Sequence, residues 1–166
     1  MAIAPVIYGL VFSQVAVNAM EVHERHQSYA KARAASEASG KPLVVVGGSV
    51  PSSTLLRAIH WRSHGCGDTC IDLDPGACWG CPNFIQADIR NIPLPDRFAG
   101  AAFASHVLEH LPTVADAEKA LIELHRIGDQ VFIAYPSKLN LVAWGHPEHH
   151  LWVYQAADGV VRFEQR

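Results

Sequence analysis

The sequence has 166 residues, of which 49% are apolar and 17% charged; this fits one globular domain with an extra segment and excludes a chain that is disordered throughout. The formal net charge is -3, and residues 42–166 hold nine Lys and Arg against thirteen Asp and Glu. A nucleic-acid-binding face needs clustered positive charge, so we expect no nucleic acid among the partners.

The first twenty residues carry no charged side chain, and roughly 20 such residues suffice for a helix to cross a bilayer. We therefore predict that residues 1–20 form an apolar helix that anchors a single-pass membrane protein. Positive charges follow it closely and place the domain on the cytoplasmic side; they are Arg25, Lys31, Arg33 and Lys41. The alternative is a helix buried against the domain or a partner subunit, because Pro5, Gly9 and Asn18 make the stretch less apolar than a typical membrane helix.

Residues 21–41 predict a connecting helix. The segment is rich in Ala, Glu, Lys and Arg, which are good helix formers, and it stops at Gly40-Lys41-Pro42, a helix-ending pattern. The chain is thus divided into the N-terminal helix (1–20), the connecting helix (21–41) and one domain (42–166).

From residue 42 short apolar runs alternate with turn residues and helical stretches, a pattern typical of βα units and a parallel sheet. We expect strands at 43–46, 69–73, 84–87, 101–105 and 130–135, with helices over 51–61 and 113–127. Two β-rich runs, 151–154 and 160–163, flank Ala157-Asp158-Gly159 and predict an antiparallel hairpin. The expected fold is α/β: a Rossmann-like, mostly parallel sheet with a C-terminal hairpin, preceded by a long helix.

Candidate ligand-binding residues follow the predicted strands, because an open parallel sheet binds ligands at the carboxyl ends of its strands. Gly47 and Gly48 let the backbone approach a ligand closely, and the next helix offers its N-terminal amides. Asp72 is placed to accept hydrogen bonds from two ribose hydroxyls. Asp88 and Ile89 are placed to present a carboxylate to an exocyclic amine and an amide to a ring nitrogen.

Two runs, 87–98 (ADIRNIPLPDRF) and 104–111 (ASHVLEHL), resemble the corresponding region of class I S-adenosylmethionine-dependent methyltransferases. The similarity extends more thinly over residues 42–135, and the run 146–150 (HPEHH) is similar to a loop of small-molecule members. The resemblance implies the class I fold, S-adenosylmethionine as the cofactor, and methyl transfer to a small or membrane-derived, lipid-like acceptor.

The resemblance also implies roles for particular residues. Asp72 would hold the cofactor ribose, Asp88 would meet the adenine, Ile89 would add a backbone contact, and Gly47 matches the first glycine of the cofactor loop. The complete candidate set for cofactor binding is Gly47, Gly48, Ser49, Asp72, Leu73, Asp88, Ile89 and Ser105.

The chain departs from the family pattern at four positions. Val45 and Ala99 stand where the family carries acids, and Ser49 and Pro51 where it carries glycines. These departures leave a second interpretation open: a catalytically degenerate protein that kept the fold and serves as a membrane-anchored structural or accessory subunit.

His106 is the candidate catalytic residue. It lies just past the fourth predicted strand, where a neutral imidazole can take a proton from the methyl acceptor. The alternative is a structural histidine that caps the strand end. Tyr135, His149 and His150 are expected to line the acceptor side.

The run from His106 to His110 matches the H-x-x-E-H pattern of a zinc peptidase group. That pattern requires both histidines on one face of an established helix, whereas here a strand ends at His106 and Pro112 follows. We therefore predict neither zinc hydrolysis nor a metal site at these residues.

Four cysteines lie within sixteen residues: Cys66, Cys70, Cys78 and Cys81. Their spacing allows a metal site or disulfides. Because one of them lies inside a predicted strand and a cytoplasmic domain keeps its thiols reduced, we favour ordinary thiols over either alternative.

Overall fold

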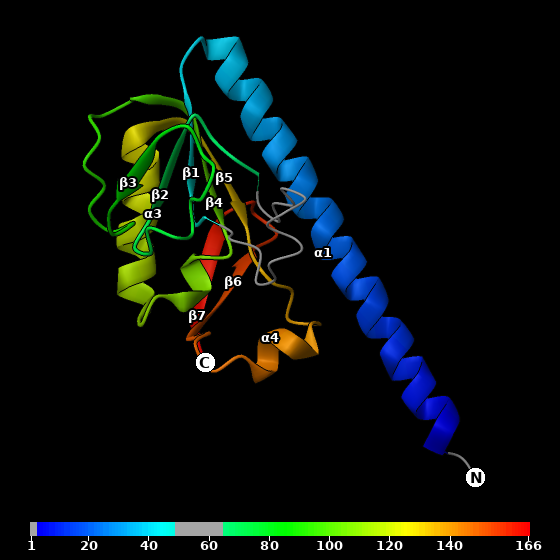
Figure 1. The fold of residues 1–166 in the computed structure, drawn as a ribbon. Helices are drawn as coiled ribbons and strands as arrows, with labels where there is room; N and C mark the ends of the chain where they lie inside the picture. Colours follow the sequence, from blue (N-terminus) through cyan, green and yellow to red (C-terminus); the bar gives the residue numbers. More distant parts are fainter. Residues whose placement is uncertain (1–2, 49–64) are drawn as a thin grey trace.

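The computed structural model describes residues 3–48 and 65–166, and the predicted helix over 51–61 lies outside this range. Five parallel strands form a sheet in the order β3-β2-β1-β4-β5 (Figure 1). The strands are β1 (Leu43–Val46), β2 (Thr69–Asp72), β3 (Phe84–Gln86), β4 (Ala99–Ser105) and β5 (Gly128–Ala134). This topology confirms the expected Rossmann-like α/β fold, and the order reverses between β1 and β4.

The central strand β1 is apolar throughout because both of its faces are covered. Val45 packs with Ala32 of α1 (Ile3–Ser39) and with Phe103, whereas Val44 packs on the opposite side with residues of α3 (Val114–Ile127). All four β1 residues are buried. A strand that helices cover on both faces has no solvent side and needs no polar position.

The second half of α1 is part of the domain. The Tyr29 ring packs edge-on against Phe103 with centroids 5.7 Å apart, and the Tyr29 hydroxyl donates to the Cys66 carbonyl. Arg33 pairs with Asp68 at 3.2 Å. The two helical segments expected over 1–20 and 21–41 are one continuous helix in the structure.

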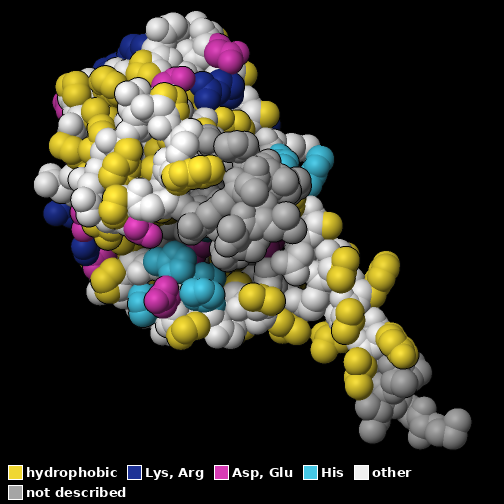
Figure 2. All heavy atoms as spheres, viewed as in Figure 1, with side chains coloured by type: hydrophobic (Ala, Val, Ile, Leu, Met, Phe, Trp, Pro, Cys, Tyr) yellow, Lys and Arg dark blue, Asp and Glu magenta, His cyan; other side chains and the backbone are white. Residues whose placement is uncertain are grey.

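The first turns of α1 project beyond the sheet (Figures 1 and 2), and Val6 and Phe12 are 70% and 76% exposed. Across the described residues, no helix combines the length and apolarity that a membrane crossing requires. The predicted membrane span over 1–20 is therefore not supported. A physical reason lies in the polar residues of this stretch, since Gln14 exchanges hydrogen bonds with the backbone at Leu139 and Leu141. The expected cytoplasmic localisation is not tested and stays a prediction.

The C-terminal part adds short elements around the end of the sheet (Figure 1). The single-turn 3-10 helix η1 (Leu108–His110) follows β4, and α4 (Leu141–Gly145) follows β5. Strands β6 (Leu151–Gln155) and β7 (Val161–Gln165) pair as the predicted antiparallel hairpin, separate from the main sheet. Neither η1 nor α4 was expected from the sequence.

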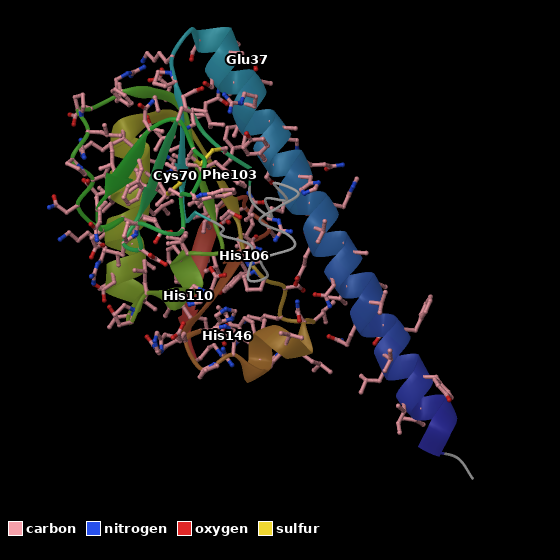
Figure 3. All side chains as sticks on the ribbon, in the orientation of Figure 1. Glu37, Cys70, Phe103, His106, His110 and His146 are labelled. Carbon is pink, nitrogen blue, oxygen red and sulfur yellow. A yellow bond between two sulfur atoms is a disulfide. The ribbon has the colours of Figure 1, made fainter. Side chains whose placement is uncertain are left out.

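The four cysteines form two disulfides, Cys66–Cys81 and Cys70–Cys78, so the preferred interpretation as ordinary thiols is wrong. The segment after β2 folds back and brings the Cα atoms of each pair to 5.8 Å, a separation typical of bridged cysteines. Figure 3 shows the sulfur bond beside Cys70 at the sheet. With their sulfurs bonded to each other, these cysteines do not form the alternative metal site either.

Candidate functional site

A pocket of about 610 Å³ opens at the carboxyl ends of β1, β2 and β4; we call it the strand-end pocket. Within the described ranges, every residue predicted for cofactor binding or catalysis lines it, namely Gly47, Gly48, Asp72, Leu73, Asp88, Ile89, Ser105 and His106. Ser49 lies outside the described residues. Residues from four separate segments thus converge on one concave surface, although their individual roles stay predictions.

Gly47 allows β1 to end tightly against the end of β4. Its φ is +86°, in the region that favours glycine, and a Cβ at this position would lie 2.1 Å from the Val107 Cγ2 and 2.9 Å from the Ser105 carbonyl oxygen. Its backbone N–H donates to the Ile71 carbonyl at 3.0 Å. A glycine is therefore required here by both conformation and space.

The Asp72 carboxylate fixes the backbone on two sides of the pocket. One oxygen accepts the Gly48 N–H at 2.8 Å and the other accepts the Asp74 N–H at 2.9 Å. An ionised carboxylate has about four acceptor positions, and the described residues occupy two of those of Asp72. This arrangement suits the ribose contact that the sequence predicts.

The Asp88 carboxylate is held by Arg90. The closest contact is 2.6 Å from Arg90 Nη2, and Arg90 also donates through its backbone N–H and its Nε. The hydrogen bonds from Arg90 hold the pKa of Asp88 below its usual value. Arg90 in turn reaches Asp116 on α3 at 2.7 Å.

The amino group of an adenine would therefore compete with Arg90 for the Asp88 carboxylate oxygens. The next residue, Ile89, also lines the strand-end pocket. The sequence reasoning missed Arg90. The sequence contains one signal for this ion pair, since a basic residue lies two positions after Asp88.

His106 and Glu109 form a pair at the end of β4. His106 Nδ1 lies 3.3 Å from Glu109 Oε1, and the Glu109 side chain is only 1% exposed. A carboxylate at Nδ1 favours the tautomer with its proton on that nitrogen, which makes Nε2 the basic one. His106 adopts φ +53° while its N–H donates to the Ala134 carbonyl, so the strand pairing continues up to it. Both expected roles, base and strand-end residue, are compatible with this geometry.

The three residues expected on the acceptor side are distributed over different pockets. His150 lines the strand-end pocket, together with Glu148 and His110. Tyr135 lines a pocket of about 310 Å³ between α1 and β5, and His149 lines one of about 220 Å³ next to α4. His106 borders all three, so it occupies the junction between them.

Comparisons with known proteins find similarity to methyltransferases. Residues 55–130 match the family model described as "Methyltransferase domain". The malonyl-[acyl-carrier protein] O-methyltransferase of Serratia marcescens is 31% identical in an alignment 114 residues long that covers 60% of this chain. The chain spans 44% of the length of that relative.

A solved structure was also found, that of 1,6-didemethyltoxoflavin-N1-methyltransferase of Burkholderia thailandensis with bound 1,6-didemethyltoxoflavin and S-adenosylhomocysteine. It is 16% identical, with a TM-score of 0.39, over 98% of this chain and 73% of that one. The matched family model, which covers just under half of the chain, and the curated relative both support the resemblance of this chain to the class I S-adenosylmethionine-dependent methyltransferases, the family whose cofactor is S-adenosylmethionine.

Proposed function

We propose that this chain binds S-adenosylmethionine in the strand-end pocket and transfers the methyl group to a small-molecule acceptor. The lipid-like acceptors expected from the sequence belong to this class. The observation that carries the proposal is the convergence of the predicted residues from four segments on one pocket. Its volume of about 610 Å³ is typical of small-molecule sites, roughly 300–1,000 Å³.

The residues present fit this cofactor at three points. The Gly47–Gly48 turn brings backbone close to the methionine part, Asp72 has acceptor capacity for the ribose hydroxyls, and Ile89 offers an apolar side chain and a backbone amide for the adenine. Asp88, already hydrogen-bonded to Arg90, would contribute to the adenine contact only by exchanging one of those bonds.

The bound cofactor supplies an electrophilic methyl group on a sulfonium. The work left to the chain is to hold an acceptor in line with it and to remove the acceptor's proton. His106 lies at the junction of the pockets with Glu109 at its Nδ1, so it is placed to take that proton on Nε2. The buried Glu109 then stabilises the imidazolium that forms.

Isothermal titration calorimetry with S-adenosylhomocysteine tests the proposal without knowledge of the acceptor. We expect saturable binding of one molecule per chain. The absence of detectable heat at high protein concentration, with a folded protein by circular dichroism, would contradict it.

A second candidate is an accessory protein that kept the fold without the activity. Two observations favour it: Val45, where the family carries an acid, is fully buried in the core between β1 and α1, and the Asp88 carboxylate is held by Arg90. Failure of a folded protein to bind S-adenosylhomocysteine is the result expected from this candidate. Saturable binding together with methyl transfer in an acceptor screen would exclude it.

A further inference from the structure

Three histidines from two segments lie together beside the strand-end pocket. His110 belongs to η1, and His146 and His149 to the loop between α4 and β6. The His146 and His149 rings stack with centroids 4.3 Å apart, and His110 lies edge-on to His149 at 4.7 Å. Figure 2 shows histidine side chains gathered on this face, and Figure 3 shows His110 and His146 close together below the sheet.

We propose that His110, His146 and His149 bind one divalent transition-metal ion of the zinc type. Each ring offers one nitrogen, and these atoms all lie within 4.8 Å of one another. Neutral imidazole is a preferred ligand of Zn²⁺, and three histidines with a fourth, open position form a common zinc coordination set. This site is additional to the proposed cofactor site and does not depend on it.

The closure needed for binding is small. A tetrahedral ion with Zn–N bonds of about 2.0–2.1 Å holds its ligand nitrogens roughly 3.3–3.4 Å apart. The three ligand nitrogens therefore need to approach one another by about 1.5 Å at most, with reorientation of the stacked His146 and His149 rings. All three histidines are only partly buried, so an ion can reach them from solvent.

Hydrogen bonds to groups outside the cluster orient the His110 ring and hold the loop that carries the other two histidines. His110 Nδ1 donates to the Glu148 carbonyl at 3.1 Å, which leaves the lone pair on Nε2, the usual arrangement of a metal-bound histidine. The loop backbone is fixed as well: His150 N–H donates to the Glu109 carbonyl at 2.8 Å, and Arg166 donates to the His149 carbonyl at 2.9 Å.

Two buried polar groups beside the cluster favour a cation there. His149 Nδ1 is inaccessible to solvent and has no hydrogen-bond partner within residues 3–48 and 65–166, an arrangement that costs free energy unless the atom finds one. The carboxylate of Glu109 is 1% exposed, pairs with His106 Nδ1 at 3.3 Å and acts electrostatically on His149. Its negative charge offsets the positive charge of Arg166, which donates to the His149 carbonyl.

The site has a structural consequence for the pocket. Glu148 and His150 of the same loop, and His110 itself, line the strand-end pocket. A bound ion would therefore cross-link the loop between α4 and β6 to η1 and hold the pocket residues of both segments in place.

The test uses the full chain without an affinity tag, stripped with a chelator, with both disulfides verified by thiol assay. We expect one Co²⁺ per chain with visible ligand-field bands of a low-symmetry nitrogen–oxygen site, displaced by Zn²⁺, and no thiolate charge-transfer band. His146→Ala and His149→Ala should each weaken binding more than about 100-fold, since even changes outside the first coordination sphere cost about 10–100-fold. His125→Ala, an exposed histidine on α3, is the matched control and should bind normally.

Nitrogen-detected NMR of the wild-type imidazoles gives a second measurement that needs no variant, and Zn²⁺ should shift ring nitrogens of three histidines. The proposal is overturned by weak binding that is equal in the wild type and in folded His149→Ala, by a thiolate band, or by shifts spread over other histidines.

Discussion

The carboxylate of Asp72 accepts the backbone N–H of Gly48 at 2.8 Å and thereby joins the carboxyl ends of the neighbouring strands β1 and β2. The same side chain stabilises the turn after β2 through the Asp74 N–H. One carboxylate thus positions the backbone of the strand-end pocket, and the same carboxylate is the group proposed to bind the cofactor ribose.

We expect Asp72→Ala to weaken S-adenosylhomocysteine binding at least about 100-fold, because two hydrogen bonds to a charged group contribute roughly 1.5–3 kcal/mol each. Calorimetric titration provides the measurement. Asp158→Ala removes a turn aspartate of the β6–β7 hairpin and should leave the affinity unchanged. Unchanged binding in Asp72→Ala would place the ribose elsewhere.

Gly47→Ala should lower the free energy of unfolding by about 2–5 kcal/mol. The left-handed conformation costs an alanine roughly 1–2 kcal/mol, and overpacking against Val107 adds about 1–3 kcal/mol. Urea denaturation at constant m-value measures the change. At Gly145 an added Cβ meets no described residue within 4 Å outside its own helix and chain neighbours, so Gly145→Ala should cause no loss. Equal stability of both variants would contradict the tight approach of β1 and β4.

The disulfides should be detectable in the untreated protein as two cross-linked pairs in peptide mass spectrometry, without alkylated thiols. The double variant Cys66→Ser/Cys81→Ser should lose about 3 kcal/mol of stability, because this bridge closes a loop of 15 residues. Thermal and urea unfolding measure the loss. Modification of all four cysteines in the denatured but unreduced protein would disprove the pairing.

Arg90→Gln should make the protein less sensitive to acid. Hydrogen bonds from Arg90 lower the pKa of Asp88, so their stabilisation is present above the ordinary carboxyl pKa of about 3.9 and is lost as the pH falls through the lower native value. Without Arg90 the pKa of Asp88 rises, and the fall of stability below about pH 4 becomes shallower. NMR titration of the Asp88 carboxyl group measures the pKa directly.

Arg162→Gln is the control for this variant. Asp158, the partner of Arg162, owes its lowered pKa first to the backbone N–H of Val160, which the substitution leaves in place. We therefore expect Arg162→Gln to change the pKa of Asp158 less than Arg90→Gln changes the pKa of Asp88. An Asp88 titration that is the same with and without Arg90 would show that the ion pair is not formed in solution.

The parts that could be predicted from the sequence are those that local composition determines. The run Leu43–Val46 is apolar because helices cover both faces of β1, and Thr113 marks the start of α3 because its side chain accepts the Asp116 N–H. The sequence could also predict that the candidate residues lie close together, because residues that follow parallel strands meet at one edge of the sheet.

The remaining features depend on contacts that composition does not encode. Cys70 finds Cys78 only because the chain after β2 turns back on the sheet, so the pairing follows from the path of the turn. Arg90 forms ion pairs with both Asp88 and Asp116, and Asp116 belongs to α3, which lies later in the chain. His110 and His146 are separated by 36 positions and meet only through the loop before β6.

The long helix α1 affects how the protein moves through solution. Its 37 residues span about 55 Å at 1.5 Å per residue, whereas a domain of this size has a radius of gyration of roughly 14 Å. A globule with a projecting rod has a raised frictional ratio and elutes early from a sizing column. A monomer of 18.1 kDa will therefore resemble a larger particle in gel filtration, and sedimentation equilibrium, which is independent of shape, gives its true mass.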